Sequence, residues 1–312
     1  MTSSTPGGWD FSPAGASPPG ALGQLPPVIP PPGTGFGTVD QPPPPSGSPR
    51  PSGAGDRVRT VIRGIGQTLI TLGCILLLFV VYEVWVSNLY AHKAQDKVAK
   101  KYEAAVAQGQ DPLKQQDRLN LPSGKQVVIP AGSGFANLYI PRFGKDYAWT
   151  IVEGTDDGDL ERGPGHYTGT AIPGQIGNFS LAGHRVGKGE PFLNLDQLQP
   201  GDPIVVQTAS NWYVYRVLGD KSLVASKGDE AALAVPDSQG VVGREIVSPS
   251  QVSVIDKVPD HPGATPTRAL LTLTTCHPKY TANQRMIIHA DLARSVPVKG
   301  SALPKELSGG TL

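Results

Sequence analysis

The sequence predicts an all-β domain of roughly eight strands, preceded by one membrane-spanning helix. From about residue 127 the chain has short apolar or alternating runs that are typical of strands, among them NLYIPRF, GNFSLAGH, PIVVQT, NWYVYRVL, RALLTLTT and RMIIHADL. Turn sequences such as DDGD, GPG, QPGD and HPGATP separate these runs. This pattern indicates a barrel or a sandwich, and we place the domain at residues 127–297.

The membrane helix is predicted by an almost continuous apolar run from about Ile65 to Val86. The run is long enough to span a bilayer, and Trp85 and Tyr90 lie where interfacial aromatic residues are expected. It begins too far from Met1 for an ordinary cleaved signal peptide, and no small-residue cleavage site follows it. We therefore expect an uncleaved signal anchor over residues 61–88.

Segments of low complexity or high charge flank these two parts. Residues 1–60 are rich in proline and glycine and have too few large apolar residues to offset the entropy of ordering, so we expect a disordered tail. Residues 89–126 begin with HKAQDKVAKKYEAAVAQ, which predicts a helical stalk followed by a linker. Residues 298–312 are predicted to be a disordered C-terminal tail.

Charge and short motifs narrow the function. The 27 basic and 26 acidic side chains give a formal net charge of +1, which gives no reason to expect a nucleic-acid partner. No HExxH, CxxC or P-loop motif is present, and the acidic run EGTDDGDLE lacks the EF-hand spacing, so we expect no metal or other cofactor. Basic residues on the two sides of the membrane helix are nearly balanced, so charge alone does not decide its orientation.

The two cysteines lie in different surroundings. Cys74 belongs to the apolar run, whereas Cys276 ends a predicted strand of the β domain, so the two are not expected to pair. If the β domain is outside the cell, an unpaired thiol there needs a chemical explanation. It is either a catalytic nucleophile or a small buried hydrophobic residue.

Strand parity places three reactive residues on equivalent faces. Alternate side chains of a strand face opposite sides, so Cys276 ends the less apolar face of RALLTLTTC. Arg285 lies on the less apolar face at the start of RMIIHADL, and His184 does so at the end of NFSLAGH. An imidazole can accept the proton of a thiol, and a guanidinium can stabilise negative charge on a carbonyl oxygen under attack.

Each assignment has an alternative at this point. The histidines His166, His277 and His289 compete with His184 for the role of base. Arg285 could instead be an ordinary surface ion-pair partner.

The motifs around these residues resemble those of the sortase family of Gram-positive bacteria. TLTTC at Thr272–Cys276, followed by Arg285, is similar to the family signature TLxTC…R, and AGHR at Ala182–Arg185 resembles its histidine motif. The best match is class E, the housekeeping-type sortases of actinobacteria, through GPGHYTGTAIPGQIGNFSLAGHR and TLTTCHPKYTANQR. The resemblance covers about residues 127–293 and implies a closed eight-stranded β-barrel with short helices.

The resemblance also implies an activity, that of a membrane-anchored cysteine transpeptidase. Cys276 would be the nucleophile, His184 the acid or base and Arg285 the stabiliser of substrate and oxyanion, while Tyr167 and Thr275 would contact the substrate. A C-terminal sorting signal of LPxTG or LAxTG type on a secreted protein would be cleaved through a thioester. An amine of a lipid-linked peptidoglycan precursor would resolve the thioester, which requires an extracellular catalytic domain and a cytoplasmic N-terminus.

Two other functions remain open from the sequence. A pilus-polymerising sortase would pass the thioester to a lysine of a pilin subunit. A non-enzymatic adaptor would bind partners through its Pro-rich tail and would bury an inert Cys276. Residues 219–243 are longer than we expect for class E and form either a surface loop or a cover on the groove, and residues 258–267 are a candidate groove wall.

Overall fold

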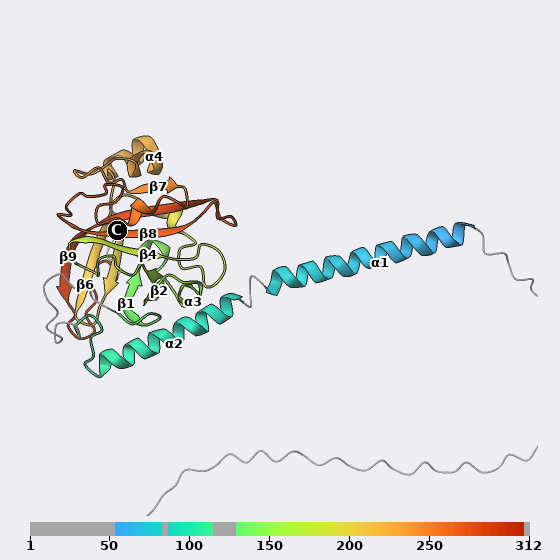
Figure 1. The fold of residues 1–312 in the computed structure, drawn as a ribbon, viewed down its shortest axis with the longest axis horizontal. Helices are drawn as coiled ribbons and strands as arrows, with labels where there is room; N and C mark the ends of the chain where they lie inside the picture. Colours follow the sequence, from blue (N-terminus) through green and yellow to red (C-terminus); the bar gives the residue numbers. More distant parts are fainter. Residues whose placement is uncertain (1–53, 83–86, 115–128, 309–312) are drawn as a thin grey trace, which may run out of the picture. The chain divides into compact units, whose positions relative to one another are not determined.

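The computed structural model describes residues 54–82, 87–114 and 129–308 (Figure 1). Most of the predicted N-terminal tail, the last four residues and most of the predicted linker therefore lie outside the described residues. The α-helices of the described residues are α1 (Ala54–Val81), α2 (Ser87–Ala107), α3 (Asp157–Leu160) and α4 (Val224–Leu233).

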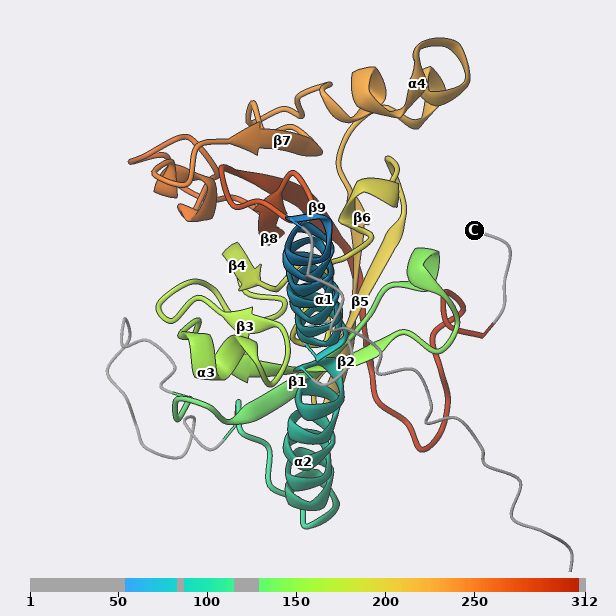
Figure 2. The ribbon, with the colours of Figure 1, turned by 90° about the vertical axis from the view of Figure 1, so that its right-hand side faces the viewer.

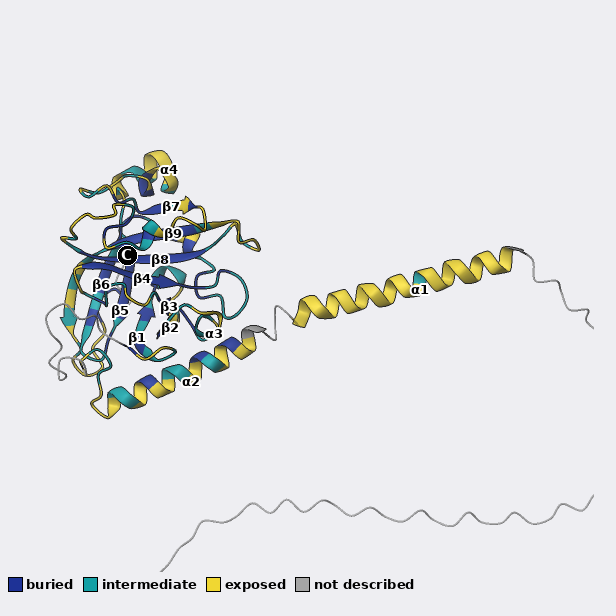
Figure 3. Cartoon of the chain, viewed as in Figure 1, coloured by how far each residue is buried: buried dark blue, intermediate teal, exposed yellow. Residues whose placement is uncertain are grey.

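Helix α1 contains the apolar run. Its segment Gly55–Val81 is long and apolar enough to cross a membrane, and its side chains are exposed almost throughout (Figure 3). The hydroxyls of Thr68 and Thr71 donate to the carbonyl oxygens of Gly64 and Gln67, four residues earlier. Polar side chains in an apolar helix are thereby satisfied within the helix, as a bilayer requires.

Eight strands close into a barrel in the order β6-β5-β1-β2-β3-β4-β8-β9, and pairing of β9 with β6 completes the ring. The β2–β3 and β4–β8 pairs are parallel, whereas the other pairs are antiparallel. Closure removes the exposed edges of an open sheet. The predicted closed eight-stranded barrel is confirmed, and its strands are β1 (Gly134–Tyr139), β2 (Ala148–Glu153), β3 (Gly165–His166), β4 (Gly177–Ala182), β5 (Pro203–Gln207), β6 (Asn211–Val217), β8 (Ala269–His277) and β9 (Gln284–Pro297).

Strand β9 is long enough to serve two neighbours on one edge. Its second half pairs with β6, and its first half pairs with the additional strand β7 (Arg244–Val247). Along its other edge it pairs with β8 over the register Leu270–Asp291 to His277–Gln284. The β8–β9 pair is therefore held on both sides close to the end that carries Cys276.

The core fills the barrel with apolar side chains from alternate strand positions. Phe135, Phe179, Leu271 and Ile288 are all fully buried there. Burying each such side chain contributes about 1.5–3 kcal/mol. Because side chains alternate along a strand, the opposite faces of β4, β8 and β9 are free to carry other chemistry.

The long connection at residues 219–243 folds against the barrel. It contains α4, whose Leu233 is fully buried in the barrel core, and α4 lies next to β7 in both views (Figures 1 and 2). Nη2 of Arg244 donates to Glu230 at 2.8 Å, and Nη1 donates to the backbone oxygen of Asp196 at 2.9 Å. The insertion is therefore packed onto the barrel by a buried leucine and an ion pair.

The C-terminal segment differs from the expectation of a disordered tail beginning at residue 298. Residues 298–308 are described, and Glu306 is buried between Arg216 and Arg294, with contacts of 2.9 and 2.5 Å. Leu307 packs against the apolar cluster that includes Trp212. The polar composition of the segment does not predict this contact with the barrel. The contact depends on one buried carboxylate that pairs with two arginines of the barrel wall.

Candidate active site

Cys276 and Arg285 lie on the adjacent strands β8 and β9, and His184 follows the end of the next strand, β4. Cys276 of β8 pairs directly with Arg285 of β9. Strand β4 runs parallel to β8 in the register Ala182–Thr274, so His184, two residues further on, is level with Cys276. Neighbouring strands lie about 4.8 Å apart, so the row brings an imidazole, a thiol and a guanidinium onto one end of the barrel wall.

The histidine segment is tied to the cysteine strand beyond the end of β4. The amide of Gly183 donates to the carbonyl oxygen of Thr274 at 3.1 Å, and the Thr275 hydroxyl donates to the carbonyl oxygen of Gly183 at 2.7 Å. Thr275 is only 3% exposed. It faces away from Cys276, as strand parity requires, and its hydroxyl ties the histidine segment to the cysteine strand.

His184 has the environment of a base that is free to act. Its ring is partly buried, and Nε2 is buried without a hydrogen-bond partner among the described residues. Burial lowers the pKa of His184 and Lys188 lowers it further, while Asp157 and Glu161 act in the opposite direction. The neutral imidazole is therefore favoured near pH 7, and it can accept a proton.

The competing histidines already have partners. Nδ1 of buried His166 is hydrogen-bonded to Glu153 at 2.6 Å, and Nε2 of fully buried His289 is hydrogen-bonded to Glu245 at 3.0 Å. His277 accepts a hydrogen bond from Arg185 on its Nδ1. The three histidines that competed with His184 for the role of base are therefore engaged in structural contacts.

The structure adds a residue that the sequence prediction missed. Arg185 is only 3% exposed and donates to the carbonyl oxygen of Cys276 at 3.4 Å and to His277 Nδ1 at 2.8 Å. It also forms an ion pair with Asp196 at 3.3 Å. Burial and the charge of Arg185 lower the pKa of His277. The sequence did offer a signal for this role, because Arg185 directly follows His184 in the motif AGHR. This position puts a fixed cation beside the cysteine strand.

A small pocket opens beside Arg285. Its volume is about 80 Å³. Tyr167 lies in its wall, and the Tyr167 hydroxyl is hydrogen-bonded to the Thr274 hydroxyl at 2.9 Å. The rest of the wall is mostly apolar and comes from β9 and the segment after β7: Val247, Pro249, Gln251, Val252, Val254, Ile255 and Ile287.

Two segments that the sequence offered as parts of a substrate groove lie outside the wall of this pocket. Neither the insertion at 219–243 nor the loop at 258–267 contributes a lining residue, and the segment 247–255 takes that place. Arg285 faces the pocket while its Nη1 donates to the carbonyl oxygens of Ala282 and Gln284 at 2.9 and 3.0 Å. These two bonds hold the guanidinium at the pocket mouth.

The acidic run EGTDDGDLE is engaged by neighbouring groups. Glu153 is bound to His166, Asp159 forms an ion pair with Arg162 at 3.5 Å, and Glu161 forms one with Lys188 at 3.0 Å. Across the part of the chain that the structure describes, no group of three or more His, Cys, Asp or Glu side chains is placed to hold a metal ion.

Comparisons with known proteins identify the family of the chain. A family model described as "Sortase domain" matches residues 138–293. The chain is 35% identical over 242 residues to Sortase SrtE1 of Streptomyces coelicolor, covering 75% of this chain but only 58% of that protein. It is 33% identical to Sortase SrtE2 of the same organism, covering 78% of this chain and 87% of that protein. The solved SrtF sortase from Corynebacterium diphtheriae is 40% identical with a TM-score of 0.52, covering 61% of this chain and 100% of that one.

Proposed function

Since the chain belongs to the sortase family, whose members are cysteine transpeptidases, we propose that it joins secreted proteins to a cell-wall precursor. It would cleave a C-terminal sorting signal of LPxTG or LAxTG type and transfer the new carboxyl end to an amine of a lipid-linked peptidoglycan precursor. The observation that carries this proposal is the pairing of Cys276 with Arg285 on β8 and β9, with His184 two residues beyond the last β4 residue that pairs with β8.

The first half of the reaction uses the neutral imidazole. His184 accepts the thiol proton of Cys276, and the thiolate attacks the carbonyl carbon of the signal's threonine. Negative charge develops on the carbonyl oxygen, and the guanidinium of Arg285 stabilises it. The imidazolium then protonates the departing amine as the C–N bond breaks, which leaves a thioester on Cys276.

The second half reverses the proton transfers. An acceptor amine loses a proton to His184 and attacks the thioester carbonyl. The C–S bond breaks, and the Cys276 thiolate recovers its proton from the imidazolium. A new amide bond forms, and the enzyme returns to its starting state.

The small pocket beside Arg285 is our proposed site for the sorting signal. Its apolar wall suits the signal's first residue, leucine, because apolar side chains fill such pockets while a few polar groups fix orientation. Tyr167, bound to Thr274, would contact the signal's second residue. Val252 at the wall is 70% exposed, so an apolar surface is available to the peptide.

We propose that α1 anchors the enzyme by a single pass, with the N-terminus in the cytoplasm and the barrel outside. The support for this orientation is chemical, because sorting signals and lipid-linked precursors meet on the outer side of the membrane. A tethered enzyme and two membrane-bound substrates share a small volume, which raises their effective concentration.

Replacing each cysteine in the full chain, in detergent micelles, tests the proposal. Cys276→Ala should reduce cleavage of a fluorogenic LAxTG peptide by at least about 10³-fold and remove the thioester adduct seen by mass spectrometry. Cys74→Ala is the matched control, because it deletes the other thiol, on α1, and should retain full activity. Activity retained by Cys276→Ala, or lost equally in both variants, would contradict the proposed nucleophile.

A further inference from the structure

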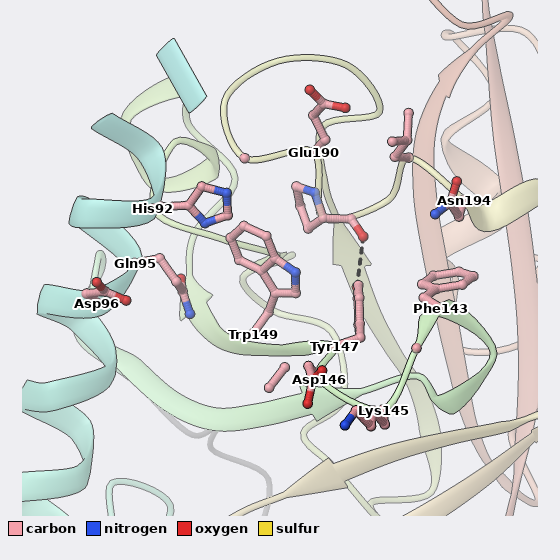
Figure 4. Close-up of a pocket in the computed structure, with 15 residues that line it drawn as sticks. His92, Gln95, Asp96, Phe143, Lys145, Asp146, Tyr147, Trp149, Glu190 and Asn194 are labelled. Atoms are coloured by element: carbon pink, nitrogen blue, oxygen red, sulfur yellow. Dashed lines mark hydrogen bonds between the residues drawn. The ribbon is translucent and has the colours of Figure 1, made fainter. Parts of the chain in front are cut away.

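A second and larger cavity lies between α2 and the barrel (Figure 4). Its volume is about 770 Å³, which is within the usual range for ligand pockets. Residues 92–96 of α2, residues 143–149 at the start of β2 and residues 189–194 line it. The row of catalytic residues and the small pocket share none of these residues, so the cavity needs its own explanation.

The floor of the cavity is aromatic and fixed. Trp149 is 8% exposed and stacks on His92, with ring centroids 5.6 Å apart. The Tyr147 hydroxyl donates to the carbonyl oxygen of Pro191 at 2.8 Å, and Phe143 packs edge-on against Tyr147. A floor held by stacking and a hydrogen bond keeps its shape before a ligand arrives, which lowers the entropic cost of binding.

The rim of the cavity carries carboxylates. Figure 4 shows Asp96, Asp146 and Glu190 around the stacked His92 and Trp149 rings. Asp96 and Asp146 are exposed, and neither forms an ion pair within the described residues. The two exposed carboxylates of Asp96 and Asp146 outnumber the single ammonium of Lys145 among the lining residues. A rim of this charge attracts cations, and aromatic faces next to it favour an ammonium group in particular.

One loop joins the cavity to the catalytic histidine. The amide of Phe192 donates to the carbonyl oxygen of His184 at 3.0 Å, which closes a loop between the two residues. Residues 187–190 all have left-handed backbone conformations, with φ of 71°, 51°, 83° and 53°. Gly189 lies so close to Trp149 that an added Cβ would be 2.7 Å from the indole. The loop that begins at His184 is therefore also a wall of the cavity.

The cavity is also tied to the membrane by a short length of chain. Its first lining residue, His92, follows the last residue of α1, Val81, by eleven positions. A chain of that length spans at most about 40 Å even when fully extended. A ligand of this cavity therefore binds within reach of the membrane surface.

We propose that this cavity binds the acceptor amine, with its ammonium group near Asp96 and Asp146 and the chain that carries it over the aromatic floor. The assignment rests on the proposed function, because only a transpeptidase needs a second, amine-bearing substrate. From this position the amine is delivered along the loop to His184, which removes its proton before attack on the thioester.

The double variant Asp96→Asn/Asp146→Asn of the full chain in micelles tests this assignment. Wild-type enzyme is given a LAxTG peptide and increasing triglycine or lysine amide, and transfer and hydrolysis products are quantified together. Neutralising each exposed carboxylate should raise the amine concentration at half-maximal transfer by about threefold, so the ratio of transfer to hydrolysis falls. Glu103→Gln removes an exposed carboxylate from α2 outside the cavity and is the matched control.

Two results distinguish failure of the acceptor site from failure of the proposed function. A transfer-to-hydrolysis ratio in the double variant equal to that of Glu103→Gln overturns the acceptor site while leaving the sortase activity intact. If the wild type cleaves no peptide, the proposed function fails, and the site is judged by fluorescence alone. Triglycine should then still change the Trp149 emission saturably, relative to Trp149→Phe, whereas N-acetyl-triglycine should not, and an equal response to both probes overturns the proposal.

Discussion

Two histidines, one on β3 and one just beyond the end of β4, have very different surroundings in this fold. His166 on β3 is 2% exposed, and its two ring nitrogens are bound to Glu153 and to Thr170 and Ala171. His184, just beyond β4, is partly exposed and has a buried Nε2 without a partner among the described residues. The first histidine is a satisfied structural group, and the second has a ring nitrogen without a hydrogen bond among the described residues.

The difference indicates where the fold leaves a polar group without a hydrogen bond, so that the group is available for chemistry. Buried polar groups are nearly always paired, so an unpaired one in a packed region marks a candidate functional site. The two arginines near Cys276 repeat the contrast. Arg185 is buried and committed to Cys276, His277 and Asp196, whereas Arg285 uses only Nη1 for backbone contacts.

Separate substitutions of the two histidines should have the largest and most different effects on activity and stability. His184→Gln should lower peptide cleavage by about 10²–10⁴-fold with an unchanged melting temperature, because it removes the proton carrier from a site with no structural partner. His166→Gln should destabilise the fold by about 1–3 kcal/mol, because buried Glu153 loses its partner. Activity assays on the folded fraction and thermal melts, run side by side, separate the two effects.

The expected pattern is a double dissociation between activity and stability. A melting temperature lowered equally by both substitutions would mean that His184 is also structural. Loss of cleavage in well-folded His166→Gln would mean that the base has been assigned to the wrong histidine.

The arginine pair should give the next largest effect. Arg285→Lys keeps a positive charge but loses the planar donor fork, so cleavage should fall by about 10²-fold with little change in stability. Arg185→Lys should mainly lower stability, because it leaves the Cys276 carbonyl oxygen and His277 Nδ1 without their donors. Measuring kcat, KM and the melting temperature of both variants distinguishes an oxyanion stabiliser from a positioning residue. A stronger effect of Arg185→Lys on kcat would reverse these roles.

Much of the site could be predicted from strand parity alone. Alternation placed Cys276 and Arg285 on one face, and the register of β8 with β9 now pairs them directly. The same rule places Thr275 on the opposite face, where its hydroxyl donates to the carbonyl oxygen of Gly183.

Features that depend on contacts between distant segments could not be predicted. The large cavity needs α2 to pack beside β2, with His92 stacked on Trp149, and no local pattern specifies that pairing. The docking of the C-terminal segment depends in the same way on one carboxylate, Glu306, meeting two arginines far away in the sequence. Local periodicity predicts strands and their faces, whereas tertiary ion pairs and stacks appear only in the folded chain.

The smallest expected effect concerns the charges around His184. Its pKa is lowered by burial and by Lys188 and raised by Glu161, and these two residues pair with each other at 3.0 Å. Since the neutral imidazole is the active form, activity falls as the pH drops through its pKa.

Lys188→Gln should raise that pKa and move the acid limb of kcat/KM to higher pH, whereas Glu161→Gln should move it to lower pH. At a fixed pH on this limb the activity should change by about two- to fivefold in opposite directions, and less at high salt, because both charges are partly exposed. Profiles that shift in the same direction would show that the limb belongs to a group other than His184.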